Sequence, residues 1–424
     1  MRKTLIVGGG GREHAIAWKL AKDDPELELI AVPGNPGIAA HARCMPSSGS
    51  HVTALADLAD AERPDLTIVG PEAPLAAGLA DELQARGHLV FGPTAAAARI
   101  ESSKSFAKEL MREAGVPTAA ARVFTEPEEA KAYARELGAP LVVKASGLAA
   151  GKGVTVCGTL SEADEVIDAL LRLRTLGDSG SEVLVEEFMQ GEELSVLVIT
   201  DGERFTPLLP ARDHKRLGDG DTGPNTGGMG AYSPVPGVSL DLVHEVGASI
   251  IRPTLAALRT RGTPFRGVLY AGLMLTPDGP RVVEFNCRFG DPEAQVILPL
   301  LESPLLPLLA SAARGELEGE GQVWALAYAV TTVVAAAGYP ERPRAGDAIT
   351  LPPSDPDVLV FHAGTATDSN GALVSSGGRV LSITGIAPTF ERAVACSRSA
   401  AEQVELHGKQ LRRDIGGREL ERRA

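Results

Sequence analysis

The sequence predicts a multidomain protein of the α/β and α+β classes, with a doubly wound parallel sheet in its N-terminal domain. The 424 residues exceed what one hydrophobic core usually serves. Apolar strand-like runs alternate with helical segments near the N-terminus, which is typical of a parallel sheet, and short strands followed by one long helix near the C-terminus indicate a small α+β domain. We expect domains at 1–101, 102–324 and 325–424, the middle one with a small lid subdomain at about 120–190.

The composition excludes several classes of partner. The net charge is -14 and the isoelectric point is about 5.2, whereas a nucleic-acid or anionic-membrane surface needs a concentrated basic face. No window of about 18 uninterrupted apolar residues could span a membrane, and the N-terminal apolar run stops at Gly8, too early for a signal peptide. The four cysteines form no Cys-x-x-Cys pair, which fits a reducing compartment. We therefore expect a cytoplasmic protein that binds neither nucleic acid nor membrane.

The N-terminal domain is predicted to bind a ligand at one edge of its sheet. Strands are expected at 5–7, 29–32, 66–69 and 88–91, and helices near 12–22, 52–63 and 75–86. Ligands of such sheets lie at the carboxyl ends of the strands. Gly10 and Gly11 stand there before a helix, where backbone N–H groups favour an anion, and Glu72 follows another strand on the same edge. Glu13 stands where a nicotinamide dinucleotide motif needs glycine, so a phosphate pocket and a merely tight turn remain as interpretations.

The central region opens with features of a nucleotide site. A strand at 140–144 delivers Lys144 into a glycine-rich turn that contains Gly151 and Lys152, and the chain returns as a second strand. Such a hairpin can fold over a polyphosphate, because glycine permits close backbone approach and lysine supplies charge. The Walker pattern Gly-x-x-x-x-Gly-Lys-Ser/Thr is absent. Lys104 begins a helix upstream, and the alternative for such a lysine is a solvated surface position.

A later strand, 183–188, ends in Glu186, Glu187 and Phe188. Its end can present backbone groups to a purine, and Glu193 follows closely enough to reach ribose hydroxyls. The alternative is that these acidic side chains are simply solvated, as most are. Their position after the Lys144 hairpin favours the nucleotide interpretation.

A second hairpin, 267–275 with 281–288, carries three polar residues on one face. In a strand, Glu284, Asn286 and Arg288 alternate onto the same side. Carboxylate and amide oxygens are hard ligands that suit Mg²⁺. An arginine next along that face can stabilise a transferring phosphoryl group. The Glu-x-Asn-x-Arg pattern therefore predicts a metal and phosphoryl-transfer face.

Residues 213–234, called the wall segment below, are dense in glycine and in charge of both signs. The segment opens on Asp213-His214-Lys215-Arg216 and exceeds the roughly 12 to 15 residues of an ordinary structureless connection. We predict no regular helix or strand in it, because glycine frees the backbone and Asp, Asn and Thr favour turns. Long loops on a rigid scaffold usually bind ligands, and a surface linker is the alternative.

The C-terminal hundred residues predict strands at 325–334, 349–351, 358–362, 372–374 and 379–384, then a helix near 389–404. Arg379 follows two glycines and can either reach an anionic ligand or lie on the surface. Residues 412–416 contain two arginines and an aspartate, for which we expect at most a structural ion pair.

The order of these motifs resembles that of ATP-grasp ligases: Lys104, Lys144 with its glycine hairpin, Glu186 to Phe188, Glu193, and Glu284-x-Asn286. Within that superfamily the chain is similar to the phosphoribosylamine-glycine ligase family, also called glycinamide ribonucleotide synthetases. The resemblance covers nearly the whole chain, and the wall segment is its most specific motif. Further matching motifs are Gly9 to Ala15, Pro33 to Asn35, Val69 to Leu75, Gly147 to Val154 and Glu284 to Glu293.

The resemblance implies ligation of glycine to 5-phosphoribosylamine through glycyl phosphate, with ATP and Mg²⁺ or Mn²⁺ as cofactors. It implies catalytic roles for Lys144, Asp213 and Arg288, with Asp213 paired to the glycine ammonium, and metal ligation by Glu284 and Asn286. The nucleotide positions it implies are Lys104, Lys144, Gly151, Lys152, Glu186, Glu187, Phe188 and Glu193. The substrate positions we expect are Gly10, Gly11, Asn35, Glu72, Asp213, Asp291 and Arg379. We expect a monomer.

Three positions depart from the family pattern. Ser146 stands where Asp is expected, Arg212 stands where Gln is expected, and 267–275 lacks the acid that would help to hold a second metal ion. The alternatives are another ATP-grasp carboxylate-amine ligase or carboxylase of purine metabolism, and a non-catalytic nucleotide-binding protein. Retention of the lysines and of the metal-type ligands favours the ligase.

Overall fold

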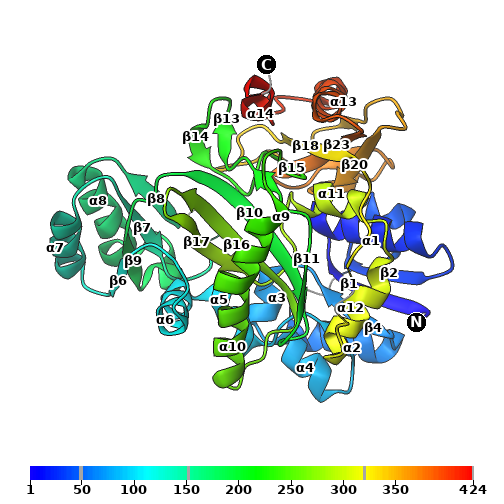
Figure 1. Cartoon of the computed structure of the whole chain (residues 1–424). Coiled ribbons are helices and arrows are strands. Elements are labelled where there is room, and N and C mark those ends of the chain that lie inside the picture. The colour runs from blue at the N-terminus through cyan, green and yellow to red at the C-terminus, as the bar shows by residue number, and fades with distance from the viewer. Residues whose placement is uncertain (47–50, 150–152, 319–320, 423–424) are drawn as a thin grey trace.

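A computed structural model describes residues 1–46, 51–149, 153–318 and 321–422 (Figure 1). The N-terminal domain, the lid to one side and the C-terminal region surround a central antiparallel sheet. Within the described residues, no helix has both the length and the apolar character needed to cross a bilayer.

The N-terminal domain is a five-stranded parallel sheet with strand order β3-β2-β1-β4-β5, as the alternating pattern predicts. Side chains that alternate along β1 enter different cores, Leu5 and Val7 one cluster and Ile6 another, so this strand is buried on both faces. The predicted helix 75–86 is interrupted by Gly78 at φ +88°, a left-handed conformation that suits glycine. The elements are β1 Lys3–Gly8, α1 Gly11–Asp23, β2 Glu28–Pro33, β3 Arg43–Cys44, α2 Val52–Glu62, β4 Leu66–Val69, α3 Glu72–Ala76, α4 Leu79–Ala85 and β5 Val90–Phe91.

The described part of the central region contains two four-stranded antiparallel sheets. The lid sheet has the order β6-β9-β7-β8 and packs with two helices around a hydrophobic core of its own. The second sheet has the order β11-β10-β16-β17. The lid elements are β6 Ala121–Phe124, α7 Pro127–Leu137, β7 Leu141–Ala145, β8 Val154–Cys157, α8 Leu160–Ile167 and β9 Val183–Glu187. The other elements are α5 Ala95–Ser102, α6 Lys104–Ala114, β10 Glu192–Thr200, β11 Phe205–Pro207, α9 Leu240–Val246, α10 Arg252–Thr260, β16 Gly267–Thr276, β17 Gly279–Asn286, α11 Ala294–Ile297 and α12 Leu305–Arg314.

The prediction that the wall segment forms no regular strand is wrong. It contains β13 Arg216–Gly218, β14 Thr222–Asn225 and β15 Gly230–Ser233, and its first residue ends β12 Arg212–Asp213. β13 and β14 close a hairpin through a turn in which Gly220 and Asp221 adopt φ +66° and +56°. β15 pairs with β18 Tyr328–Ala335, with Gly230 opposite Thr332. The local pattern missed β15 because its partner β18 lies about a hundred residues later in the chain. It missed the hairpin β13–β14 because the Gly, Asp and Asn residues of that stretch are typical of turns rather than of strands.

The C-terminal region builds a mixed layer of strands and one long helix. Its main sheet has the order β12-β15-β18-β23-β20, so it includes strands from both sides of residue 325. The predicted strands and the final helix are present: β19 Ile349–Thr350, β20 Val358–His362, β21 Thr365–Thr367, β22 Leu373–Ser375, β23 Arg379–Ala387, α13 Phe390–Gln403, β24 Glu405–Leu406 and α14 Gly417–Glu421. Sharing a sheet with the wall segment places the C-terminal region directly at the site.

Candidate active site

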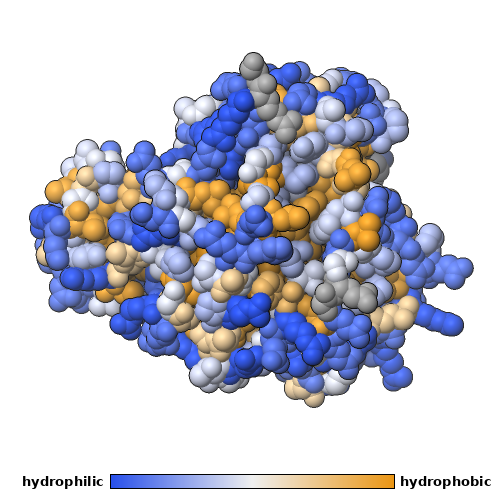
Figure 2. Space-filling model, viewed as in Figure 1, coloured by the Kyte–Doolittle hydropathy of each residue, from blue (hydrophilic) through white to orange (hydrophobic). Residues whose placement is uncertain are grey.

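One cavity of about 920 Å³ is lined by residues from all three predicted domains. The recess between the lid and the C-terminal region is visible in Figure 2, with apolar residues around it. The predicted site residues that line the cavity are Glu72, Lys104, Lys144, Glu186, Glu187, Phe188, Glu193, Asp213, Glu284, Asn286, Arg288, Asp291 and Arg379. Gly10, Gly11 and Asn35 are not among its lining residues, and Gly151 and Lys152 lie outside the described residues.

Lys144 and Lys104 enter the cavity from the lid side. The Lys144 ammonium lies 2.9 Å from Oε2 of Glu186 and donates to the Val283 carbonyl at 3.0 Å, which ties the lid sheet to β17. Lys104 is the first residue of α6, and burial lowers its pKa although Glu284 opposes that shift. Ser146, one of the departures from the family pattern, accepts the Lys104 N–H at 2.9 Å and the Ser105 N–H at 3.2 Å. It therefore fixes the start of α6 against the end of β7.

The acidic residues at the end of β9 are engaged by the protein. Glu187 accepts from the Ala120 N–H at 3.0 Å and from Arg281 at 2.6 Å. Glu193, on β10, lies 2.6 Å from the Lys215 ammonium. Phe188 remains 42% exposed at the cavity edge. The β9 end thus offers a ligand mainly backbone groups and one aromatic face.

The metal-type residues lie as the period-two pattern predicts, on the cavity face of β17. Among the described residues the Glu284 carboxylate has no hydrogen-bond or ion-pair partner. Burial raises its pKa, but Lys215, Lys104 and other cations outweigh that effect and hold the pKa below its usual range. The amide oxygen of Asn286 accepts from Arg288 at 3.3 Å. An ionised carboxylate and an amide oxygen facing one cavity fit Mg²⁺, which needs few protein ligands when phosphates supply the rest.

The strand beside β17 carries no acid at this level, because Gly272 stands opposite Glu284. No group of three or more His, Cys, Asp or Glu residues with metal-binding geometry occurs in the described part of the chain. Glu284 and Asn286 are therefore the candidate metal ligands on this face of β17.

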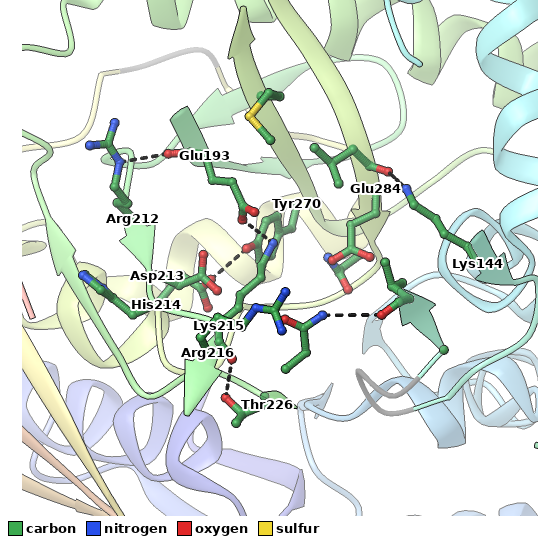
Figure 3. A pocket seen from close by; sticks show the side chains of 18 of the residues that line it. Lys144, Glu193, Arg212, Asp213, His214, Lys215, Arg216, Thr226, Tyr270 and Glu284 are labelled. Atoms are coloured by element: carbon green, nitrogen blue, oxygen red, sulfur yellow. Dashed lines mark hydrogen bonds and ion pairs between the residues drawn. The ribbon is translucent and has the colours of Figure 1, made fainter. Parts of the chain in front are cut away.

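The wall segment supplies a half-buried carboxylate, Asp213, and a lysine, Lys215, opposite this face (Figure 3). Burial, together with Glu293 and other acids, raises the pKa of Asp213 to about 7, although Lys215 opposes the shift. The Tyr270 hydroxyl donates to Glu293 at 2.7 Å and contacts the Ser195 hydroxyl at 2.8 Å. The corner formed by Asp213, Glu293 and Tyr270 can bind a cation, and the charge of Asp213 changes near pH 7.

Arg288 is held by two acids: Glu72, which the sequence marks as a candidate substrate contact, and Glu101, which it does not mark. Its Nε lies 3.2 Å from Glu72, and its Nη2 lies 3.0 Å from Glu101. Burial opposes the charge of Arg288, but Glu101 and Glu72 outweigh it and raise its pKa. Glu101 also accepts the Cys287 N–H at 2.7 Å. No local pattern marks Glu101, since it is one acid near the end of a short helix.

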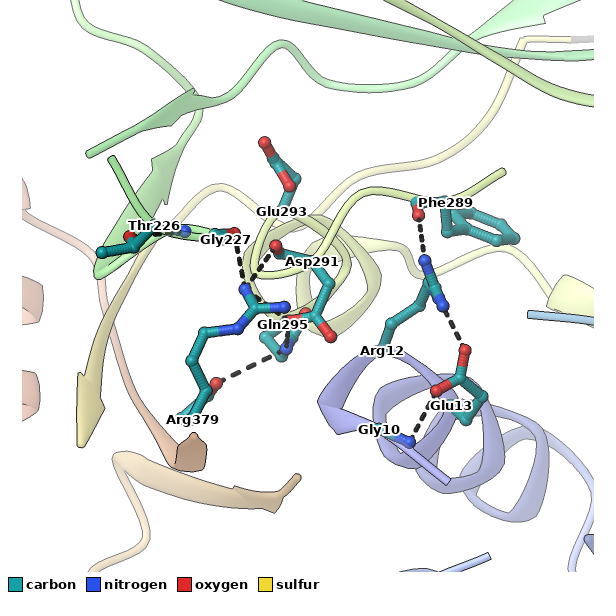
Figure 4. A network of polar contacts seen from close by, with 12 residues as sticks. Gly10, Arg12, Glu13, Thr226, Gly227, Phe289, Asp291, Glu293, Gln295 and Arg379 are labelled. Carbon is teal, nitrogen blue, oxygen red and sulfur yellow. Dashed lines mark hydrogen bonds and ion pairs between the residues drawn. The ribbon is translucent and has the colours of Figure 1, made fainter. Parts of the chain in front are cut away.

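Arg379 and Asp291 form a polar corner beside the start of α1 (Figure 4). Arg379 donates to the carbonyls of Gly227 and Asp291 at 2.6 and 2.7 Å, and it lies 3.4 Å from the Asp291 carboxylate. Arg12 lines the cavity nearby and donates to Glu13 at 2.6 Å and to the Phe289 carbonyl at 3.1 Å. Arg12 lies within the quoted Gly9 to Ala15 motif but was not predicted to contact a ligand.

The N-terminal glycines and Asn35 pack behind this corner. The Gly10 N–H, which we expected to face an anion, donates to Glu13 of its own helix at 2.7 Å. A Cβ on Gly11 would lie 2.5 Å from Nε2 of Gln295. Asn35 donates to the carbonyls of Gly9 and His362, both at 2.9 Å. In this structure these residues shape the region around α1.

The wall hairpin β13–β14 is held by residues 412–418, called the anchor segment below. Arg412 is 1% exposed and contacts Asp221 at 2.7 Å and Asp414 at 2.6 Å. Asp414 accepts the Gly220 N–H at 2.8 Å, and Arg418 pairs with Asp221. The ion pair expected within 412–416 therefore exists, and the larger set of contacts joins the chain terminus to the tip of the wall.

Three family models match the chain in sequence. Models for the phosphoribosylglycinamide synthetase N domain, ATP-grasp (A) domain and C domain match residues 2–101, 102–294 and 329–418. The chain belongs to the phosphoribosylglycinamide synthetase family. The predicted family and fold class are thereby confirmed, and the antiparallel sheets of the central region are the ATP-grasp domain of this family.

Curated relatives and a solved structure of the phosphoribosylglycinamide synthetase family are similar to this chain over nearly its whole length. A phosphoribosylamine–glycine ligase of Ralstonia nicotianae is 48% identical over 423 residues, which is 99% of this chain and 100% of the relative. The trifunctional purine biosynthetic protein adenosine-3 of Gallus gallus is 46% identical over 99% of this chain and 42% of its own length. A crystal structure of a phosphoribosylamine–glycine ligase from Thermotoga maritima aligns with a TM-score of 0.85 at 36% identity, over 97% of this chain and 100% of that one.

Proteins outside this family share the fold. The biotin carboxylase domain of the 2-oxoglutarate carboxylase of Hydrogenobacter thermophilus aligns with a TM-score of 0.75 at 19% identity, over 97% of this chain and 91% of that one. At that identity the likeness concerns the fold alone.

Proposed function

We propose that this protein joins glycine to 5-phosphoribosylamine at the expense of ATP, giving glycinamide ribonucleotide, ADP and phosphate in purine biosynthesis. It is an ATP-dependent carbon–nitrogen ligase. The observation that carries the proposal is the single cavity in which two lysines, a metal-type oxygen pair and the family's wall segment meet. Relatives of the same length are named for this activity.

The nucleotide would lie between the lid and β17. We assign its phosphates to Lys104 and Lys144, its adenine to the β9 end at 186–188, and its ribose to Glu193. Gly151 and Lys152 stay as proposed contacts of the hairpin over the phosphates. We place the phosphates here because a polyphosphate is anionic and Lys104 and Lys144 supply positive charge on this side of the cavity.

Glu284 and Asn286 would hold Mg²⁺, or Mn²⁺, against the phosphates. When bound, the ion neutralises phosphate charge and so lowers the repulsion toward an approaching carboxylate. The Glu284 carboxylate is suited to this because the surrounding cations keep it ionised.

Glycine would lie between the wall segment and Arg288. A glycine carboxylate oxygen forms a bond to the γ-phosphorus while the bond from that phosphorus to the ADP oxygen breaks, giving glycyl phosphate. Arg288 stabilises the equatorial oxygens, and Asp213 pairs with the glycine ammonium. Acyl phosphates hydrolyse readily, so closure of the lid would protect the intermediate from water.

The amine of 5-phosphoribosylamine then forms a bond to the carbonyl carbon, phosphate leaves with its bonding electrons, and the nitrogen loses a proton. We assign the sugar phosphate to the corner of Arg379, Asp291 and Glu72, to which the structure adds Arg12. Gly10, Gly11 and Asn35 would shape this end of the cavity. We also propose a monomer as the active unit and the division of the chain at 1–101, 102–324 and 325–424.

The test is ADP release measured with each component omitted in turn. Full release should require glycine, phosphoribosylamine, ATP and Mg²⁺ together. Equal release without the amine, or a preference for formate or bicarbonate over glycine, would contradict the proposal and favour another ATP-grasp ligase or carboxylase.

A further inference from the structure

Lys108, a largely buried lysine on α6, does not line the cavity but contacts a residue that does, Glu186. The Lys108 ammonium donates to the Thr118 hydroxyl at 2.7 Å and to the Ala119 carbonyl at 3.0 Å, and it lies 3.4 Å from Oε1 of Glu186. Its side chain is 12% exposed. The position belongs to none of the motifs that the sequence analysis used.

Glu186 lies between two lysines. Its Oε2 is 2.9 Å from Lys144, and its Oε1, buried and without a hydrogen-bond partner, faces Lys108. Glu186 is 1% exposed, so water screens little of its charge. Without Lys108, the Glu186 carboxylate would cancel the charge of Lys144. With Lys108, the three groups together carry one net positive charge.

We propose that Lys108 is a positioning residue that compensates Glu186 and so leaves the charge of Lys144 available to the phosphates of the nucleotide. The proposal rests on the assignment of the nucleotide phosphates to Lys144. It extends that assignment to a residue that touches neither nucleotide nor metal. A buried carboxylate between two ammonium groups also helps to fix the lysine side chains, since each loses one of its partners if Glu186 moves.

The charge of Lys108 is expected to be titratable. Burial lowers its pKa to about 8, with Glu186 opposing the shift and with Lys144 and Arg281 adding to it. Glu187 also faces Lys108. Above that pH the three-group cluster becomes neutral, and below it the positive charge is present. Affinity for a polyphosphate should therefore be highest below pH 8 and should fall as the pH rises through it.

The probe is ADP with excess Mg²⁺, whose binding is measured by calorimetry on the full chain. Lys108→Met keeps the length of the side chain and removes the charge, and we expect it to weaken ADP binding roughly tenfold at pH 7. Adenosine, which has no phosphate, should bind equally to both proteins. Lys131→Met is the matched control, because Lys131 is a buried lysine that also lies outside the cavity lining, but its ion pairs are with Asp168 at 2.7 Å and Glu128 at 3.8 Å and not with Glu186.

The outcomes separate the two proposals. If the wild type does not bind ADP, the proposed function fails. If the wild type binds and Lys108→Met binds equally well, or if ADP and adenosine weaken together, only the role of Lys108 fails. Titrations of the wild type from pH 7 to 9 give a test that needs no variant: affinity should fall severalfold, and a constant affinity would overturn the proposal. Lys108→Met should lose most of that fall.

Discussion

The anchor segment offers a direct test of whether the C-terminus shapes the active site. The variant is Arg412→Met, which keeps a long apolar stem and removes the guanidinium that contacts Asp221 and Asp414. The same change removes its hydrogen bond to the Arg216 carbonyl at 3.2 Å. The wall hairpin would then keep fewer contacts with the terminus.

The size of the effect follows from burial. Removing one partner of a fully buried ion pair costs about 3–5 kcal/mol. Arg412 is 1% exposed, but the side chains of Asp221 and Asp414 are 37% and 33% exposed, so water compensates them in part. We therefore expect about 2–3 kcal/mol of lost unfolding free energy, below the fully buried range.

The loss of activity should mainly affect the part of the cavity that binds glycine and phosphoribosylamine. Asp213, Lys215 and Arg216 line the cavity from the segment that the anchor holds. We expect KM for glycine and phosphoribosylamine to rise roughly tenfold, and KM for ATP to change less, because the lysines of the nucleotide side belong to other elements. Steady-state kinetics with each substrate varied, together with urea unfolding, measures both effects.

Arg392→Met is the control, since Arg392 pairs with Asp357 in a solvent-exposed contact of the same region. It should change neither stability nor KM by more than a small amount. The reasoning is refuted if Arg412→Met loses the expected stability while the KM values for glycine and the amine stay at their wild-type values. Equal rises in all three KM values would also refute it, because they would indicate a general loss of structure.

Three further predictions concern charge. Burial raises the pKa of Asp213 to about 7. Below pH 7 the carboxylate that pairs with the glycine ammonium becomes protonated, so the glycine KM should rise by up to roughly tenfold per pH unit. Asp213→Asn should remove that pH dependence, and an unchanged pH profile in the variant would exclude the pairing of Asp213 with the ammonium. Glu284→Gln should raise the Mg²⁺ concentration needed for half-maximal activity roughly tenfold or more. If the variant needs the same Mg²⁺ concentration as the wild type in a Mg²⁺ titration, Glu284 is not a metal ligand. Burial lowers the pKa of His14 to about 3 and of His362 to about 4, below the value of about 6.5 in the unfolded chain. The unfolded chain therefore binds more protons than the folded protein between pH 6.5 and 4. The free energy of unfolding should keep its full value above pH 6.5 and fall below it by up to about 1.4 kcal/mol per pH unit for each histidine. His14→Gln should reduce that slope in urea unfolding, and an unchanged slope in the variant would contradict the prediction.

Much of the nucleotide and metal side could be predicted because its residues follow local rules. Glu284 and Asn286 share a face through the period of two along a strand, and Lys144 ends a strand before a glycine-rich turn. These relations span a few residues, so a pattern can reveal them. The same holds for the parallel sheet of the N-terminal domain, whose strands and helices alternate in sequence.

The supporting contacts could not be predicted in this way. Glu101 and Arg288 are 187 residues apart, and Arg412 and Asp221 are 191 residues apart. Lys108 and Glu186 belong to different elements of the central region. No periodicity links such pairs, because their distance depends on how whole sheets pack.

By itself, the sequence determined the family, the order of the domains and the residue types of the site, since those depend on local periodicity and on one long specific motif. Only the tertiary structure decided that the wall segment is a set of strands, that Gly10 bonds to its own helix while Asn35 joins the N-terminal domain to His362 of the C-terminal region, and that the anchor segment holds the wall. The physical reason is that a strand needs a partner and a buried charge needs a counter-charge, and the partners of β15 and of Arg412 come from distant parts of the chain.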